Sequence, residues 1–240
     1  MYAWRGNPGY RLDARPEEPV PLTPLQVQVA EVLHGTAGSA DFVLAGGGAL
    51  AVLGIGDRGT QDLDWFAEQP EAVDELTPAF MQECERAGLI IEQLRAEAGF
   101  CRFRLANNTD ETLVDFAWDA RIRPPLRTRY GPVLDHEELA ADKMLALFGR
   151  AAPRDFVDVY RPRDLYGRDR LCELAAEKDR GFDRSVFADM TTRLTSYERH
   201  DFPVDDETLE AMHHEFDAWR HEIRIEPEQL LDVEPPELEL

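Results

Sequence analysis

The sequence predicts an α+β protein, in which an N-terminal mixed β-sheet flanked by helices is followed by a C-terminal helical domain. Three observations carry this prediction. Strand patterns are confined to residues 42–118, helical patterns dominate from residue 136 onward, and Pro124 and Pro125 lie between the two regions. With 240 residues, of which 43% are hydrophobic and 31% charged, the chain is long enough for one large domain or two small ones.

The elements follow one another in the order expected of such a fold. Thr23 is a typical N-cap residue and Pro24 a typical first-turn residue, so the first helix begins there. Within residues 61–66, Asp62, Asp64 and Phe66 alternate with Leu63 and Trp65, which is the period of a strand. The expected strands lie at 42–45, 61–66, 89–95, 100–106 and 112–118, and the expected helices at 23–35, 49–53, 71–87, 136–149, 153–160, 168–178, 183–195 and 205–222.

Composition divides the chain into four segments. These are an irregular N-terminal arm at 1–22, an α/β core at 23–125, a helical domain at 126–225 and an acidic tail at 226–240. The net charge of −22 is uneven, because residues 121–170 hold 11 basic and 8 acidic side chains. We expect that stretch to meet any polyanionic ligand, whereas the acidic tail is typical of a solvated surface.

Two acidic residues on the second strand are the strongest candidates for chemistry. Asp62 and Asp64 are two residues apart, so both side chains leave the same face of the strand, with Cα atoms ~7 Å apart. Two neighbouring carboxylates are costly unless a cation lies between them. Their hard oxygens suit Mg²⁺, which takes the rest of its shell from waters and substrate phosphates during nucleotidyl transfer. An Asp-x-Asp pair alone is weak evidence, because aspartate is common at strand ends.

The surroundings of this pair strengthen the metal interpretation. A glycine turn, Gly46-Gly47-Gly48, lies between a strand and a helix just upstream, where backbone N–H groups can approach phosphate oxygens. The alternative is a tight turn that only needs positive φ angles. Asp115, on the strand expected at 112–118, reaches the same site if its strand pairs with that of Asp62 and Asp64. It would then be a metal ligand or the base for an incoming hydroxyl; otherwise it is an acid on an edge strand.

Three motifs in this order resemble those of the AbiEii-type nucleotidyltransferase toxins, which belong to the polymerase-beta nucleotidyltransferase superfamily. The run AGGGALAVLGIGDRGTQDLDWF at 45–66 is similar to the first motif, with Arg58 and Thr60 at its middle positions. The run LAADKMLALFGR at 139–150 resembles the lysine helix of the family, and RDFVDVY at 154–160 its following Arg-Asp-x-x-Asp motif.

The resemblance implies an activity and a set of partners. It implies a toxin of a two-gene toxin–antitoxin system, which transfers a nucleotide from a nucleoside triphosphate to an acceptor such as the 3′ end of tRNA and blocks translation. Mg²⁺ is the implied metal and a cognate antitoxin protein a possible partner. The implied metal ligands are Asp62, Asp64 and Asp115; Lys143 and Asp158 join them as catalytic residues; and the implied nucleotide contacts are Gly46, Gly47, Gly48, Arg58, Thr60, Lys143, Arg154 and Asp155.

Two positions leave alternatives open. Lys143 is the one lysine of an otherwise apolar helix, so it contacts either the triphosphate, as the resemblance implies, or Asp158 in a buried ion pair. The family's usual serine or threonine after two glycines is Gly48 here, which removes a hydroxyl. Gly48 is the one feature that favours a catalytically silent binding protein of the same fold.

The strong negative charge favours another enzyme, a small-molecule nucleotidyltransferase of the aminoglycoside-modifying kind, because a cationic drug is attracted where RNA is repelled. A basic groove beside the cleft would favour RNA, and an acidic one the drug.

The remaining features are those of an ordinary cytoplasmic protein. No run of about 18 apolar residues occurs, and Met1 to Pro19 lack the apolar core of a signal peptide. Three widely separated cysteines, Cys84, Cys101 and Cys172, show no metal spacing and are expected to be buried. We therefore expect a cytoplasmic location and no membrane segment.

Overall fold

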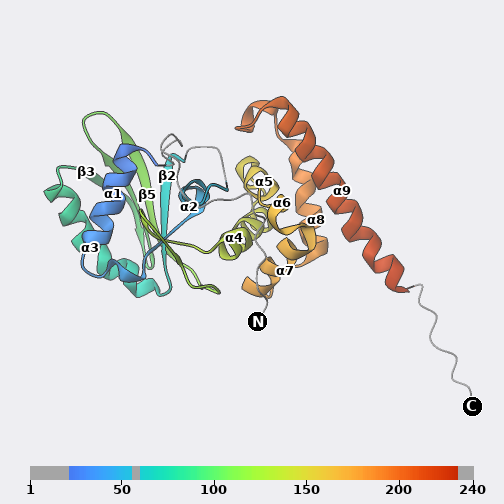
Figure 1. Cartoon of the computed structure of the whole chain (residues 1–240), viewed down its shortest axis with the longest axis horizontal. Coiled ribbons are helices and arrows are strands. Elements are labelled where there is room, and N and C mark those ends of the chain that lie inside the picture. Colours follow the sequence, from blue (N-terminus) through green and yellow to red (C-terminus); the bar gives the residue numbers. More distant parts are fainter. Residues whose placement is uncertain (1–21, 56–59, 232–240) are drawn as a thin grey trace, which may run out of the picture.

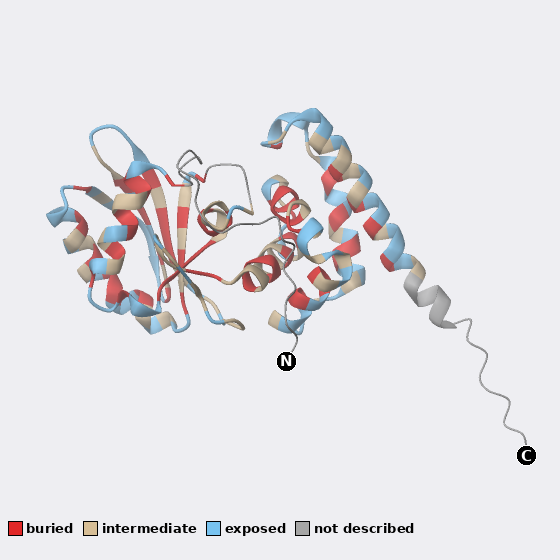
Figure 2. Cartoon of the chain, in the orientation of Figure 1, coloured by how far each residue is buried: buried red, intermediate tan, exposed pale blue. Residues whose placement is uncertain are grey.

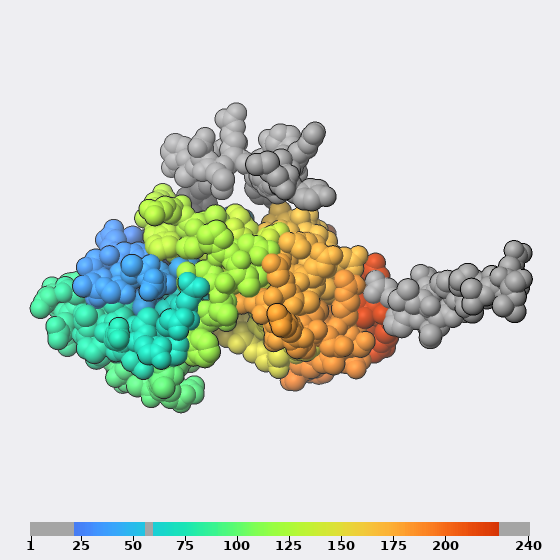
Figure 3. Space-filling view, turned by 90° about the horizontal axis from the view of Figure 1, so that it is seen from below, coloured from blue at the N-terminus to red at the C-terminus, as the bar shows by residue number. Residues whose placement is uncertain are grey.

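The computed structural model of the chain describes residues 22–55 and 60–231, including side chains as far as residue 225. A mixed sheet with helices on one face is followed by a group of helices (Figure 1). The predicted α+β class is therefore confirmed. Seen from below, the sheet part and the helical part form two adjacent lobes (Figure 3).

The sheet contains seven strands in the order β3-β4-β5-β2-β1-β7-β6. Strand β2 is parallel to β5 and antiparallel to β1. The alternative left open for Asp115 is thus decided, because its strand pairs with that of Asp62 and is not an edge strand. The strands are β1 (Val43–Ala45), β2 (Asp62–Ala67), β3 (Ile90–Glu97), β4 (Phe100–Ala106), β5 (Glu111–Trp118), β6 (Leu126–Thr128) and β7 (Gly131–Val133).

Helix boundaries follow the local signals closely. Thr23 caps α1 in a capping box: its side chain accepts from the backbone N–H of Gln26, whose side chain accepts from the N–H of Thr23. The helices are α1 (Pro24–Gly35), α2 (Gly46–Val52), α3 (Pro70–Arg86), α4 (His136–Gly149), α5 (Pro153–Tyr160), α6 (Arg163–Tyr166), α7 (Arg168–Lys178), α8 (Arg184–Thr191) and α9 (Asp206–Leu231).

Three local expectations need correction. The three glycines are not a separate turn, because they form the first turn of α2. Residues 126–133, expected among the helices, form β6 and β7 and extend the sheet beside β1. Helix α9 continues past residue 222 to Leu231, with Pro227 inside its span. The division into domains stays a prediction.

Two separate cores support the two lobes (Figure 2). The first lies between the sheet and helices α1 and α3, and it includes the apolar positions of β2, Leu63, Trp65 and Ala67. The second lies among α4, α5 and the later helices, with Phe156 and Phe216 fully buried. Alternation along β2 therefore turns its acidic residues away from the first core, onto the opposite face of the sheet.

None of the helices within the described residues is long and apolar enough to cross a membrane. The three cysteines are free and buried, as expected.

Candidate active site

A row of charged side chains crosses the sheet on the face opposite α1 and α3. In the parallel pair β2–β5, Asp64 lies directly opposite Asp115, and in the antiparallel pair β4–β5, Asp115 lies opposite Arg102. Asp62 precedes Asp64 by two residues on the same face. The strand register therefore brings the three predicted carboxylates together, and it adds an arginine that the sequence analysis did not select.

The ionised form of Asp64 is disfavoured by its surroundings. Its pKa is raised from the ordinary 3.8 to about 6, mainly by burial and in addition by the negative charges of Asp62 and Asp115. Positive charge on Lys143 and Arg154 opposes this shift. A desolvated carboxylate between two others is stabilised by a cation, and hard carboxylate oxygens suit a divalent one.

Gly46 makes the position of Asp64 possible. A Cβ atom at residue 46 would lie 1.8 Å from Oδ2 of Asp64, and the φ angle of +59° also disfavours any other residue. Gly48 is different, because its Cβ would lie 3.2 Å from Leu63 Cδ2 and 3.3 Å from Leu44 Cδ1. A side chain at residue 48 would thus begin against two core leucines rather than against the carboxylates.

We expect Gly46→Ala to damage the site more than Gly48→Ala. The new methyl group at residue 46 must displace the Asp64 carboxylate and adopt a left-handed backbone conformation, which costs ~1–2 kcal/mol by itself. Urea unfolding and a nucleotide-transfer assay measure both consequences. Equal activity and stability of the two variants would contradict the close approach of Gly46 to Asp64.

The other two carboxylates already have partners. Thr60 Oγ1 donates a 2.9 Å hydrogen bond to Asp62 Oδ1, and Arg154 lies 3.8 Å from Asp62 Oδ2. Arg102 donates to both oxygens of Asp115, from Nε to Oδ1 at 2.7 Å and from a terminal nitrogen to Oδ2 at 2.5 Å. The sequence could have indicated Arg102, because a hairpin between strands β4 and β5, with its turn at 107–110, pairs Arg102 with Asp115.

Helices α4 and α5 supply further charged side chains beside the carboxylate row on the sheet. Lys143 Nζ lies 2.9 Å from Asp158 Oδ2, and both side chains are nearly buried, at 11% and 4% exposed. The charge of Lys143 also opposes the rise in the pKa of Asp64. The lysine therefore acts both on Asp158 of α5 and on Asp64 of β2. The ion pair that the sequence left open is present, and contact of Lys143 with a triphosphate stays a prediction.

Asp155 and its neighbours have mainly structural contacts. Asp155 is 1% exposed; it accepts from the backbone N–H of Ala152 at 2.9 Å and from two nitrogens of Arg150 at 2.8 and 2.7 Å. It therefore caps α5, and its predicted contact with a nucleotide stays a prediction. Arg58 lies outside the described residues.

The three carboxylates supply the oxygen ligands that a divalent cation prefers, but the structure does not arrange them as a metal site. Within the described part of the chain, no group of three or more histidine, cysteine or carboxylate side chains is arranged to hold a metal ion. Both oxygens of Asp115 accept hydrogen bonds from Arg102. Asp62 and Asp64 offer hard oxygens on one face of β2, and burial together with the two neighbouring carboxylates raises the pKa of Asp64 despite the positive charges of Lys143 and Arg154.

The basic stretch at 121–170 is largely neutralised by neighbouring acids. The ion pairs include Arg121–Glu68, Arg123–Glu137, Arg123–Glu177, Arg150–Asp155, Arg163–Glu215, Arg168–Glu215, Arg168–Glu222 and Arg170–Glu137. Its local charge excess therefore does not form an open basic groove of these arginines. Arg154, which is 53% exposed, contacts Asp62 of the carboxylate row.

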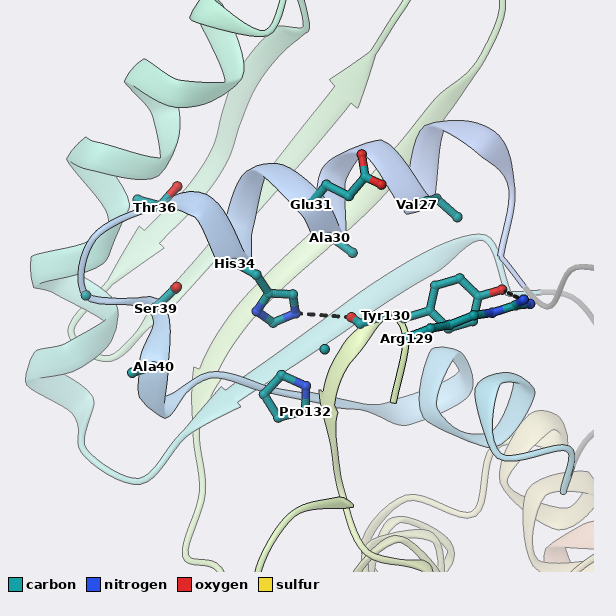
Figure 4. A pocket seen from close by; sticks show the side chains of 12 residues that line it. Val27, Ala30, Glu31, His34, Thr36, Ser39, Ala40, Arg129, Tyr130 and Pro132 are labelled. Atoms are coloured by element: carbon teal, nitrogen blue, oxygen red, sulfur yellow. Dashed lines mark hydrogen bonds between the residues drawn. The ribbon is translucent and has the colours of Figure 1, made fainter. Parts of the chain in front are cut away.

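A large hollow lies away from the carboxylates. A volume of about 1020 Å³ opens between α1 and the β6–β7 hairpin, where His34 contacts the carbonyl oxygen of Tyr130 (Figure 4). Its lining includes none of the predicted site residues. A second hollow, of about 410 Å³, is lined by Thr60, Gln61 and Arg104 among others, and so borders the site at Asp62.

The fold has counterparts among solved structures. The structure of MenT4, a nucleotidyltransferase toxin from Mycobacterium tuberculosis H37Rv, is similar with a TM-score of 0.51 and 20% identity over 82% of each chain. JHP933 from Helicobacter pylori is similar with a TM-score of 0.55 and 18% identity, over 87% of this chain and 96% of that one. These likenesses define the fold class.

The sequence itself assigns the family. Residues 33–238 match the family of the nucleotidyl transferase AbiEii toxin of type IV toxin–antitoxin systems. The chain belongs to this family, as its three motifs predicted, and it is accordingly a nucleotidyltransferase toxin. No curated protein matches the chain.

Proposed function

We propose that this toxin transfers a nucleoside monophosphate from a nucleoside triphosphate to the 3′ end of tRNA in the cytoplasm, and so blocks translation. The row of Asp62, Asp64 and Asp115 opposite Lys143 is the observation that carries the nucleotide-transfer part of this proposal. The tRNA acceptor rests on the family resemblance alone, because the paired arginines at 121–170 form no open basic groove. The family implies a cognate antitoxin that restrains the toxin. The raised pKa of Asp64 supports a divalent cation at the row, of which Mg²⁺ is the usual one for triphosphate chemistry.

Each residue has a role that its surroundings favour. Asp62 and Asp64 hold the cation, with Thr60 fixing the orientation of Asp62 through its hydroxyl. When bound, Mg²⁺ neutralises triphosphate oxygens during nucleotidyl transfer. Asp115 completes the ligand set or accepts the proton of the incoming hydroxyl.

Helices α4 and α5 supply positive charge to the triphosphate. Lys143 lies close enough to Asp64 to oppose the rise in its pKa, and Arg154 lies 3.8 Å from Asp62. Both positively charged side chains therefore border the carboxylates. Gly46 and Gly47, half-buried at the start of α2, leave backbone N–H groups without a side-chain cap. Contact of these groups, and of Gly48, with phosphate oxygens is part of the proposal.

Triphosphate and metal should bind together, because the carboxylates repel the phosphates unless a cation joins them. We expect titration calorimetry to give at least about tenfold tighter triphosphate binding with Mg²⁺ than with EDTA. Asp62→Asn should remove most of that difference, whereas Glu111→Gln, an exposed acid at the start of β5, should keep it. Equal affinity with and without Mg²⁺ would rule out the proposed carboxylate site.

The acceptor is tested separately. Labelled triphosphates are incubated with the protein and either total tRNA or an aminoglycoside. The proposal expects label at the tRNA 3′ end. Label on the aminoglycoside alone would establish the small-molecule enzyme that the net charge of −22 also favours, and no transfer with either acceptor would count against tRNA.

A further inference from the structure

We propose that Arg102 competes with the metal ion for Asp115, and so keeps the third carboxylate out of the metal site until the cation and triphosphate bind. The inference rests on the proposed function, because it takes Asp115 as a ligand of the metal. It assigns to Arg102 a positioning role, exerted through Asp115 and open to regulation by metal concentration.

The contact is of the kind that fixes a carboxylate in place. Arg102 meets Asp115 with two parallel hydrogen bonds, of 2.7 and 2.5 Å, the fork geometry that makes arginine–carboxylate pairs strong. The two residues are direct partners in the β4–β5 register, so the backbone holds them opposite each other. The Asp115 side chain is 10% exposed, which protects the pair from water on that side.

Simultaneous occupation by arginine and metal is unfavourable. The register also places Asp64 directly opposite Asp115, on the other side from Arg102. A divalent cation shared by Asp64 and Asp115 would therefore bind the carboxylate whose oxygens the guanidinium already occupies. Two positive groups on one carboxylate repel each other strongly where burial reduces screening, so metal binding at Asp115 requires that the Arg102 fork opens.

Arg102 has an alternative position that costs little. Its side chain is 44% exposed, so the guanidinium can remain in water after it leaves Asp115. Its Cζ atom lies 6.0 Å from the ring centre of Phe100, and Cζ of Arg95 lies 5.1 Å from the same ring. An aromatic face beside an exposed arginine offers a weak cation–π contact. The guanidinium therefore stays in contact with water when the fork opens, and the cation takes its place at Asp115.

A neighbouring arginine provides a matched control. Arg104 lies two residues along β4 on the same face and pairs with Glu92, at 3.0 Å, instead of with a carboxylate of the site. Arg104→Gln removes the same charge from the same strand. Any difference in metal affinity between Arg102→Gln and Arg104→Gln therefore reports on the contact with Asp115 and not on the net charge.

The experiment measures binding of MnCl₂ to the full-length protein by titration calorimetry, with and without a non-hydrolysable triphosphate. We expect Arg102→Gln to bind Mn²⁺ about three- to tenfold more tightly than the wild type, the range expected for losing one partly exposed ion pair. Arg104→Gln should change the affinity by less than about twofold. Arg102→Lys keeps the charge without the fork, and we expect an intermediate affinity.

The outcomes separate this inference from the proposed function. If Asp115→Asn weakens Mn²⁺ binding while Arg102→Gln and Arg102→Lys leave it at the wild-type value, the competition is refuted and the metal site stands. If Asp115→Asn leaves Mn²⁺ binding unchanged, Asp115 is not a metal ligand. Both its proposed ligand role and the competition by Arg102 are then refuted. Should Arg102→Gln not fold, Arg102→Lys decides alone, and a wild-type affinity in that variant would overturn the inference.

Discussion

Asp64→Asn is expected to reduce nucleotide transfer by ~10³-fold or more and to make the metal-free protein more stable at pH 8. The two effects have one cause. Asp64 is desolvated between Asp62 and Asp115, and its pKa is raised to about 6. Asparagine removes the charge that would hold the metal, and with it the repulsion that the fold carries when no metal is bound.

The pH dependence follows from the direction of the shift. A carboxyl whose pKa is higher in the folded than in the unfolded protein takes up protons on folding, so its contribution to stability is complete below the ordinary pKa of 3.8 and is lost as the pH rises through about 6. The wild type therefore loses stability relative to Asp64→Asn between about pH 4 and pH 7. At pH 8 the variant should be more stable by roughly 1–3 kcal/mol.

Urea unfolding in EDTA at pH 5 and pH 8 measures this difference. Glu111→Gln serves as the control, because Glu111 is exposed at the start of the neighbouring strand and should show little change at either pH. A variant that is less stable than the wild type at pH 8 would mark Asp64 as a structural residue. Full transfer activity in Asp64→Asn would remove it from the catalytic set.

Lys143→Met is expected to destabilise the protein by ~3–5 kcal/mol, because it leaves Asp158 as a buried carboxylate without its lysine. Asp158→Asn should destabilise the protein too. The double variant should recover part of the sum, since the two groups contact each other at 2.9 Å. Unfolding free energies of the four proteins give the coupling, and additive losses would show that the pair does not act as a unit.

Nucleotide binding separates the two roles of Lys143. The positive charge of Lys143 also acts on Asp64. We therefore expect Lys143→Met to weaken triphosphate binding in the presence of Mg²⁺, and Asp158→Asn to weaken it less. Calorimetry on folded protein, at a temperature well below the unfolding midpoint of each variant, measures both. Strong coupling in stability together with unchanged triphosphate affinity in Lys143→Met would restrict the lysine to the ion pair.

Local signals determined much of the fold before any tertiary contact was known. The Thr23-Pro24 cap, the alternation at 61–66 and the helices at 136–149 and 153–160 are encoded by near neighbours, so their boundaries could be predicted from the sequence. Strands β6 and β7 were missed because each is three residues long and, unlike the equally short β1, neither is an apolar run; β7 is held by pairing with the distant β1, and β6 by pairing with β7.

By itself, the sequence determined the family and the identity of the candidate residues, because motif spacing and alternation are properties of the chain that survive without coordinates. Only the tertiary structure decided which groups meet. The β2–β5 register placed Asp115 beside Asp64, and the β4–β5 register brought in Arg102. The packing of α4 against α5 joined Lys143 to Asp158. Strand register and helix packing are set by the burial of whole faces, which sums over residues far apart in the chain, so a local pattern can specify such partners only within a hairpin such as β4–β5.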